Sequence, residues 1–133
     1  MGIVITTDHD HHRLRASAEG TVTLGDVLTH LEQERLEAGL SRCELIDARG
    51  ATPAFSPGEV RSIVEALRRL ARESRLGPTA IVADNDIGYG LLRMLEMLVE
   101  DVCAVRPFRR VEEAEQWLAT VCGSTHAGPG GSR

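Results

Sequence analysis

Aspartate and histidine alternate near the N-terminus, in the run DHDHH at residues 8–12. Imidazole nitrogens and carboxylate oxygens are good ligands for zinc or nickel. Five adjacent residues of one turn cannot all face the same ion, however, and a metal site usually recruits a ligand from elsewhere in the chain. Neither His30 nor His126 stands at a sequence spacing that identifies it as such an additional ligand. We therefore predict no physiological metal site, and only opportunistic metal contacts at His9, His11 and His12.

A second polar run, DNDIG at residues 84–88, resembles the start of a calcium-binding loop. The later ligands of such a loop are missing, because Leu95 and Glu96 fall deep inside a predicted helix. Capping of that helix explains the run better than calcium binding does.

Covalent chemistry has few candidates in this chain. The 15 basic residues are all arginine, which excludes a lysine Schiff base and a lysine-dependent phosphate loop. Cys43, Cys103 and Cys122 are far apart and form no C-x-x-C pair, so we interpret them as small buried residues in a reducing compartment. The sequence predicts a protein that is not an enzyme and holds no cofactor.

These residues must be positioned by strands and helices that alternate along the chain, in the predicted order ββαβαβαβα. Apolar or alternating patterns predict strands at 3–7, 13–18, 43–48, 79–83 and 103–108, with a loop at 49–55. Thr23 and Ser56 are predicted helix N-caps, and Gly39 is placed to end the first helix. Helices that alternate with strands must cover both faces of a mainly parallel sheet, and the first two strands add an antiparallel hairpin.

The segment TAIVA at 79–83 is the most strand-like run of the chain and has no polar alternation, as expected for a strand covered on both faces. Parallel sheets bind ligands beyond the carboxyl ends of their strands. Two predicted loops bring polar residues to that edge. The candidate ligand- or partner-binding residues are Asp47, Arg49, Thr52, Ser56, Asp84, Asn85, Tyr89 and Arg93. For Arg93, a structural pair with Glu96 or Asp47 is the alternative to binding an anion.

The predicted helix at 86–100 is apolar nearly all round, apart from a narrow stripe that includes Tyr89, Arg93 and Glu96. Such a helix is buried on more than one side. One side should meet the sheet. The other meets another helix, a second copy of the chain or an apolar ligand, and these alternatives stay open.

Charge and composition narrow the class of partner. The formal net charge of −5 gives no general attraction to nucleic acid or to anionic membranes. No stretch is long and apolar enough to insert into a bilayer, and the N-terminus does not read as a signal peptide. The arginine-only basic residues indicate a genome rich in G and C, so we expect a bacterial, cytoplasmic protein.

Three segments carry a resemblance to a known family. Glu44-Leu45-Ile46-Asp47 is similar to a family strand that ends in aspartate. The segment at 88–96, GYGLLRMLE, resembles an F-G-x-A-R-M-x-E pattern, and Phe108, Glu113-Ala114 and Trp117-Leu118 resemble a closing F-x-x-x-E-A-x-x-W-L pattern. The chain thus resembles the SpoIIAA-like branch of the STAS fold. The resemblance implies an α/β domain over 1–121, with a single-layer mixed five-stranded sheet flanked by four helices. The Gly- and Ser-rich composition after Cys122 predicts a disordered tail at 122–133.

The resemblance also implies a test for a phosphorylation switch. Bacterial anti-anti-sigma factors carry a phosphorylatable serine in a D-S-S-G turn. Phe55-Ser56-Pro57-Gly58 falls at that place, where the usual acceptor is replaced by Pro57 and the helix cap already uses the Ser56 oxygen. We therefore expect the switch to be absent. The remaining acceptor candidates are Ser56 and Thr52.

We expect a non-catalytic STAS-like domain that binds a protein partner or a small ligand in a regulatory role, with a homodimer contact through helix 86–100 as one option. The alternative is a carrier of a small lipid-like apolar ligand, as in the Sec14-type fold. A carrier needs an enclosed apolar cavity, whereas a protein-binding module needs an exposed apolar patch.

Overall fold

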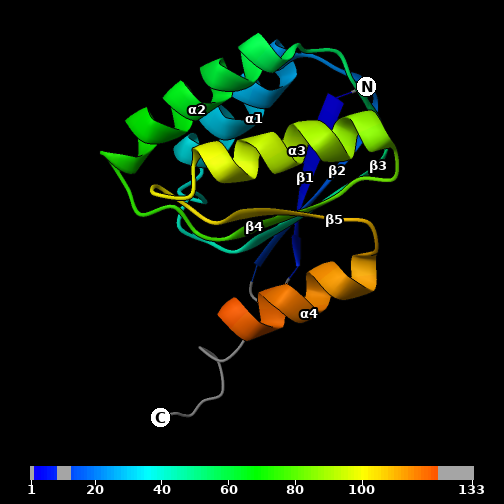
Figure 1. Ribbon diagram of the computed structural model, residues 1–133. Helices are drawn as coiled ribbons and strands as arrows, with labels where there is room; N and C mark the ends of the chain where they lie inside the picture. Colours follow the sequence, from blue (N-terminus) through cyan, green and yellow to red (C-terminus); the bar gives the residue numbers. More distant parts are fainter. Residues whose placement is uncertain (1, 9–12, 123–133) are drawn as a thin grey trace.

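The computed structural model describes residues 2–8 and 13–122, which form five strands and four helices (Figure 1). In chain order these are β1 (Gly2–Asp8), β2 (Arg13–Val22), α1 (Leu24–Leu36), β3 (Glu44–Pro53), α2 (Pro57–Ala71), β4 (Thr79–Val82), α3 (Asp86–Leu98), β5 (Val105–Phe108) and α4 (Val111–Val121). Three helices, α1 to α3, lie on one side of the sheet, and α4 lies on the other (Figure 1). The predicted order of elements is confirmed.

The strands follow one another across the sheet in the order β1-β2-β3-β4-β5. Strands β2 to β5 all run parallel, each joined to the next through a helix, and β1 pairs antiparallel with β2 at one edge. The predicted mixed five-stranded sheet is corrected here. The α/β unit is a four-stranded all-parallel sheet of β2 to β5, because β2 pairs in parallel with β3, and β1 is added antiparallel at its edge.

Strand β3 is longer than its sequence pattern indicates. The predicted loop at 49–55 is wrong over its first part, because β3 continues through Pro53 and pairs with residues 19–22 of β2. The register shifts between Ser17 and Glu19 of β2, which is the mark of a β-bulge. Backbone pairing with β2 therefore holds this weakly β-forming segment in the sheet.

Strand β4 lies inside the sheet, between β3 and β5. Ala80 and Val82 are fully buried, and they pack with Leu45, Ala114 and Leu118 on the side of α4. Ile81 packs on the opposite side, against the cluster of α2, α3 and β5. The prediction that the TAIVA segment is covered on both faces is confirmed.

Local capping fixes the start of two helices as predicted. Thr23 and Asp26 form a capping box at α1, and Ser56 and Glu59 form another at α2. The predicted end of α1 at Gly39 is corrected, since the helix ends at Leu36 and Ala38 takes the left-handed conformation, with φ 57°. A Cβ at Gly39 would lie 2.9 Å from Leu14 Cδ1, so the Leu14 side chain would have to shift to admit a larger residue.

A disulfide joins Cys43, just before β3, to Cys122 at the end of α4. This corrects the interpretation of the three cysteines as reduced thiols, although Cys103 is free. The bond also places Cys122 with the folded part of the chain rather than with the predicted tail, whose other residues lie outside the described ones. Within the described residues, no helix is both long and apolar enough to cross a membrane.

Candidate functional site

A partly open cavity of about 130 Å³ lies between the sheet and helices α2 and α3. Its wall is almost entirely apolar, and most of the strand residues in it come from the carboxyl-terminal halves of β2, β3 and β4. The residues that line it are Ile3, Ala18, Val22, Val27, Ile46, Ala48, Ala51, Pro53, Phe55, Val60, Ile63, Ile81, Ala83, Asn85, Gly88, Leu91, Leu92 and Leu95. The cavity thus lies at the sheet edge where parallel α/β folds bind ligands.

Small side chains leave this space open. Ala48, Ala51 and Ala83 stand where the strands approach the helices, and Gly88 follows in the first turn of α3. Larger residues from α3 then close the cavity on the helix side. The alanines at positions 48, 51 and 83, in and just after two strands, are the signal in the sequence that points to such a space.

Asn85 is the one polar side chain among the described residues that line the cavity. Its Oδ1 accepts a hydrogen bond from the Gly88 amide at 2.6 Å, which caps α3, and its Nδ2 donates to the Ala51 carbonyl at 3.2 Å. Asn85 therefore joins the start of α3 to the end of β3. The Asn85 amide nitrogen carries a second hydrogen, which the bond to Ala51 does not use.

The other predicted site residues are spread over several surfaces. Thr52, Ser56 and Asp84 are exposed, and Ser56 is engaged in the α2 cap. Tyr89 lies under the Arg109 guanidinium, 4.3 Å from the ring centroid. Arg93 Nε lies 3.7 Å from Glu96 Oε1, so Arg93 forms the structural pair predicted with Glu96. Asp47 pairs with Arg49 instead. Of the eight residues, Asn85 alone lines the cavity.

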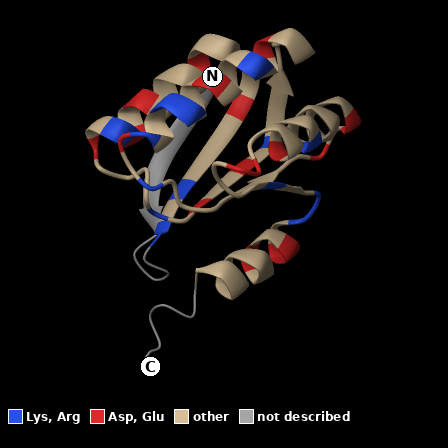
Figure 2. Cartoon of the chain, turned by 60° about the vertical axis from the view of Figure 1, so that its left-hand side comes forward, with Lys and Arg blue, Asp and Glu red and all other residues tan. Residues whose placement is uncertain are grey.

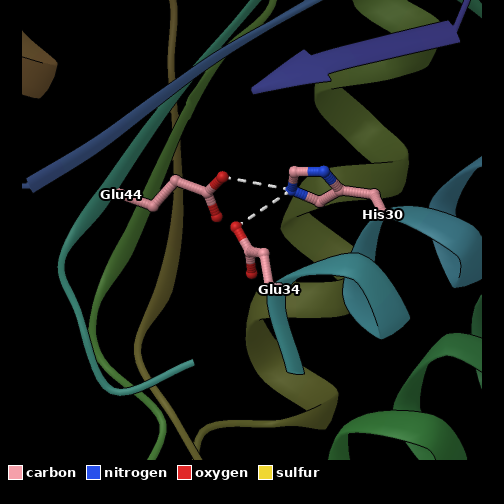
Figure 3. Close-up of side chains that lie close together, drawn as sticks. All are labelled: His30, Glu34 and Glu44. Atoms are coloured by element: carbon pink, nitrogen blue, oxygen red, sulfur yellow. Dashed lines mark hydrogen bonds and ion pairs between the residues drawn. The ribbon is translucent and has the colours of Figure 1, made fainter. Parts of the chain in front are cut away.

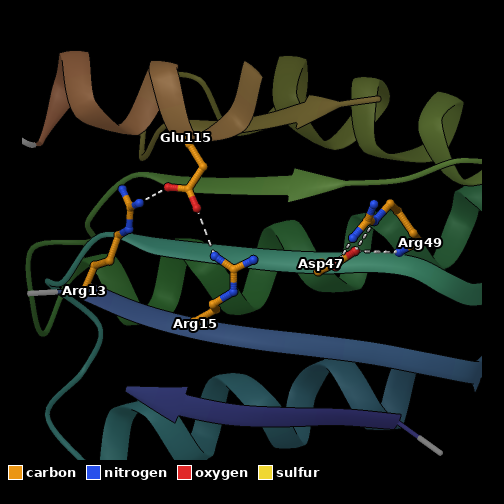
Figure 4. Close-up of polar contacts among 5 residues, drawn as sticks. All are labelled: Arg13, Arg15, Asp47, Arg49 and Glu115. Atoms are coloured by element: carbon orange, nitrogen blue, oxygen red, sulfur yellow. Dashed lines mark hydrogen bonds and ion pairs between the residues drawn. The ribbon is translucent and has the colours of Figure 1, made fainter. Parts of the chain in front are cut away.

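Asp47 and Arg49 lie within β3 rather than in an edge loop, and they face the side of the sheet that α4 covers (Figure 4). Arg49 Nε and Nη2 donate to the two Asp47 carboxylate oxygens at 2.9 and 2.8 Å. This hydrogen-bonded guanidinium holds the pKa of Asp47 below its usual range. Each charged group of this pair has the other as its hydrogen-bond partner, which favours a structural role for Asp47 and Arg49.

Beside this pair, α4 is held to the second strand by ionic contacts. Glu115 of α4 accepts hydrogen bonds from Arg13 and from Arg15, which is 3.0 Å away (Figure 4). Acidic and basic residues both occur along α1 to α3, whereas α4 carries acidic residues only (Figure 2).

A second cluster, which the sequence analysis missed, is fully buried between α1 and the sheet (Figure 3). His30 and Glu34 lie one turn apart on α1, and Glu44 is the first residue of β3. His30 Nε2 is 3.1 Å from Glu44 Oε2 and 3.2 Å from Glu34 Oε2. The signal available in the sequence is the i, i+4 spacing of His30 and Glu34.

Each group of this cluster changes the protonation of the others. Burial opposes the charged imidazole, but hydrogen bonds to Glu34 and Glu44 outweigh it and raise the pKa of His30 to about 9. Burial raises the pKa of Glu44 to about 8. Burial also opposes ionisation of Glu34, yet its contacts with His30 hold the pKa of that carboxyl below the usual value. The cluster therefore separates its two carboxyl groups, with the pKa of Glu44 raised and that of Glu34 lowered.

The opportunistic metal contacts predicted at His9, His11 and His12 lie outside the described residues. So does the turn that would carry them.

Comparison with known proteins supports the fold. A solved structure of an uncharacterised protein from Shewanella loihica PV-4, of the DUF3478 family and with a SpoIIAA-like fold, matches over 88% of this chain and 94% of that chain, with a TM-score of 0.56 and 19% identity. The chain has a SpoIIAA-like fold. The resemblance read from its motifs is thereby confirmed at the level of the fold.

No protein-family model matches the chain, and no curated protein does either. Because fold alone does not fix function, the SpoIIAA-like architecture says where a ligand would bind and not which one. The class of ligand must therefore be inferred from the size and the lining of the cavity.

Proposed function

We propose that this SpoIIAA-like protein is a non-catalytic binding protein that takes a small apolar ligand into the cavity between the sheet and α3. The observation that carries the proposal is the cavity of about 130 Å³, with its apolar wall at the carboxyl ends of the parallel strands. No nucleophile or acid–base group is found among the described residues that line it. A pocket of this kind can bind and release a ligand, and it offers nothing to transform one.

The volume limits the size of the ligand. Pockets for drug-sized molecules measure about 300–1,000 Å³, so the cavity is too small to enclose a whole lipid. It is close to the engineered apolar cavity of about 150 Å³ that holds benzene. We infer a ligand group of one ring or one short branched alkyl chain, with a polar end that accepts a hydrogen bond from Asn85. This favours a small ligand over a lipid carrier.

Binding of this kind suits a regulatory role. The cavity wall includes the start of α3 and the end of β3, which Asn85 joins. A ligand that contacts both elements would change how tightly they are held together, and thus the surface that a partner meets.

A protein partner is the second candidate, because α3 also exposes large apolar side chains. Ile87 is 74% exposed and Met97 is 62% exposed. Exposed apolar residues of this size are typical of contact surfaces when they gather on one element. A partner that contacts Ile87 would lie next to the first turn of α3 and would sense the ligand.

The proposed setting is the cytoplasm of a bacterium, without nucleic acid or membrane partners. This setting requires that Cys43 and Cys122 are reduced in the cell and form their bond only later, since disulfides persist mainly in oxidising compartments. The number of free thiols in protein alkylated at the moment of lysis decides between the two settings.

The test of the proposed function is ligand-induced stabilisation. Indole and toluene are probes of the right size, and we expect dissociation constants on the order of 0.1–1 mM for groups this small. At ten times the dissociation constant, either probe should raise the free energy of unfolding by about 1.4 kcal/mol, which appears as a higher Tm.

Two variants make the test specific. Ala48→Phe places a ring inside the cavity and should abolish the Tm increase, and Ala51→Val should weaken it. The control, Ala119→Leu, enlarges an exposed alanine on α4, on the other side of the sheet, and should keep the full increase. If neither probe stabilises the wild type, or if Ala48→Phe responds as the wild type does, the proposal is wrong.

A further inference from the structure

The buried cluster of His30, Glu34 and Glu44 joins an imidazole to two carboxylates, with no lysine or arginine among them (Figure 3). Their side chains are between 4% and 6% exposed. One potential ligand atom from each residue lies within 4.8 Å of the other two. Burying three polar groups together costs desolvation free energy, so a favourable interaction within the cluster must offset this cost.

Hydrogen bonding alone does not satisfy these groups. His30 Nε2 has one hydrogen, yet it lies 3.1 Å from Glu44 Oε2 and 3.2 Å from Glu34 Oε2. Glu34 Oε2 is buried, and its contact with His30 is an ion pair that lacks hydrogen-bond geometry. A buried carboxylate oxygen without a hydrogen bond destabilises the fold. A cation at the point where the three side chains meet would supply the missing partner.

The distances fit the edges of a coordination sphere. In tetrahedral zinc sites the metal lies about 2.0–2.1 Å from each ligand, which places the ligand atoms about 3.3 Å apart. The two separations from His30 Nε2, 3.1 and 3.2 Å, are within a few tenths of an ångström of this value, and the two carboxylates lie within 4.8 Å of each other. Three protein ligands also leave a position for a further one.

The ligand types select the class of ion. One imidazole nitrogen and two carboxylate oxygens suit divalent first-row metals such as zinc, and the set lacks the soft thiolates that copper(I) prefers. Calcium would need six or more oxygen ligands. We propose that His30, Glu34 and Glu44 form a buried site for a divalent transition-metal ion, zinc being the probe of choice, that ties α1 to the start of β3.

The test must first remove the other histidines. The chain has five histidines, and His9, His11, His12 and His126 are the ones outside the site. A background protein with these four replaced by alanine, made without a histidine tag and stripped with EDTA, keeps His30 alone. Zinc is titrated into it by calorimetry, and in parallel it is present during refolding from urea, because a buried site fills only when the fold opens.

We expect one zinc ion per chain in the background protein by elemental analysis, and a higher Tm with zinc. Cobalt(II) in place of zinc should give the visible absorption of a low-coordinate site. Glu44→Gln and Glu34→Gln, made in the same background, keep the size of the side chain but remove a charged ligand. Each should weaken zinc binding at least about tenfold. Glu37→Gln, an exposed position at the end of α1, is the matched control and should bind as the background does.

The proposal is wrong if the background protein takes up no zinc either on direct titration or on refolding from urea. Any zinc bound by the wild type would then be held by its other histidines. It is equally wrong if both glutamine variants keep the background affinity. In those cases the cluster holds protons only. Far-UV circular dichroism establishes that each variant is folded. Since indole and toluene bind elsewhere, their effect on Tm reports on the proposed function independently of this result.

Discussion

Cys103 shows how burial sets the chemistry of a single side chain. It precedes β5 and packs against the cluster of α2, α3 and β5. Burial, with a smaller effect of the Asp101 charge, raises the pKa of its thiol from 9.0 to about 11. At pH 8 this makes the reactive thiolate about a hundredfold scarcer than for an exposed thiol.

We therefore expect iodoacetamide to label Cys103 of the native protein about a hundredfold more slowly at pH 8 than in the protein unfolded in urea. Mass spectrometry of the peptide that contains Cys103 measures both rates. Equal rates would mean that the thiol is not buried as described.

The buried cluster marks the limit of residue-level prediction. The contact between His30 and Glu34 can be predicted from the sequence, because a four-residue spacing places both side chains on one face of a helix. The contact of either residue with Glu44 cannot be predicted in this way. Glu44 reaches them because β3 begins at this residue and Leu45, the next one, turns to the side of α4. Only the packing of α1 on the sheet brings the three together.

At the scale of elements, Asn85 decides how α3 begins and where it lies against β3. Asn85→Ala removes the cap of α3 and the hydrogen bond to the Ala51 carbonyl. We expect it to lower the free energy of unfolding by about 1–2 kcal/mol, measured by urea denaturation. It should also weaken indole binding.

The neighbouring variant Asp84→Ala is the control for this prediction. Asp84 is exposed and makes no part of the cap, so its replacement should change stability by less than about 0.5 kcal/mol. If Asn85→Ala were no more destabilising than Asp84→Ala, the role of Asn85 as the joint between α3 and β3 would be disproved.

Helix starts were predictable and strand lengths were not, for a physical reason. The caps Thr23–Asp26 and Ser56–Glu59 involve residues three apart, so a short stretch of sequence contains all of their chemistry. The extension of β3 to Pro53 depends on pairing with residues 19–22 of β2, more than 30 residues earlier in the chain, beyond a bulge in which Ala48 and Arg49 of β3 oppose Ala18. Long-range pairing of this kind overrides weak local preference.

At the scale of the whole molecule, the Cys43–Cys122 bond closes a loop across 79 residues and ties α4 to the sheet. Constraining the unfolded chain over such a loop is worth about 2–4 kcal/mol. Cys122→Ser should lower the free energy of unfolding by this amount in non-reducing buffer, as urea denaturation measures.

Cys103→Ser is the matched control for the disulfide, since it removes a cysteine that forms no bond. Addition of dithiothreitol should destabilise the wild type and Cys103→Ser but leave Cys122→Ser unchanged. Three free thiols in the untreated, denatured protein would show that the bond is not formed.

A homodimer through α3 stays a prediction. Met97 and Ile87 expose 62% and 74% of their surface, which a second copy of the chain would cover. Light scattering after size exclusion should give the mass of a dimer for the wild type and of a monomer for Met97→Glu. A monomeric wild type at high concentration would reject the dimer and leave both exposed residues for another partner.

Amide chemical shifts test the central claim, ligand binding in the cavity, most directly. Titration of the ¹⁵N-labelled protein with indole should shift the amides of Ala51, Gly88 and Leu91, which line the cavity, and leave those of α4 in place. The shifts should saturate with one site and disappear in Ala48→Phe. Indole that shifts no amides, or mainly those of α4, would contradict the assignment of the cavity as the binding site.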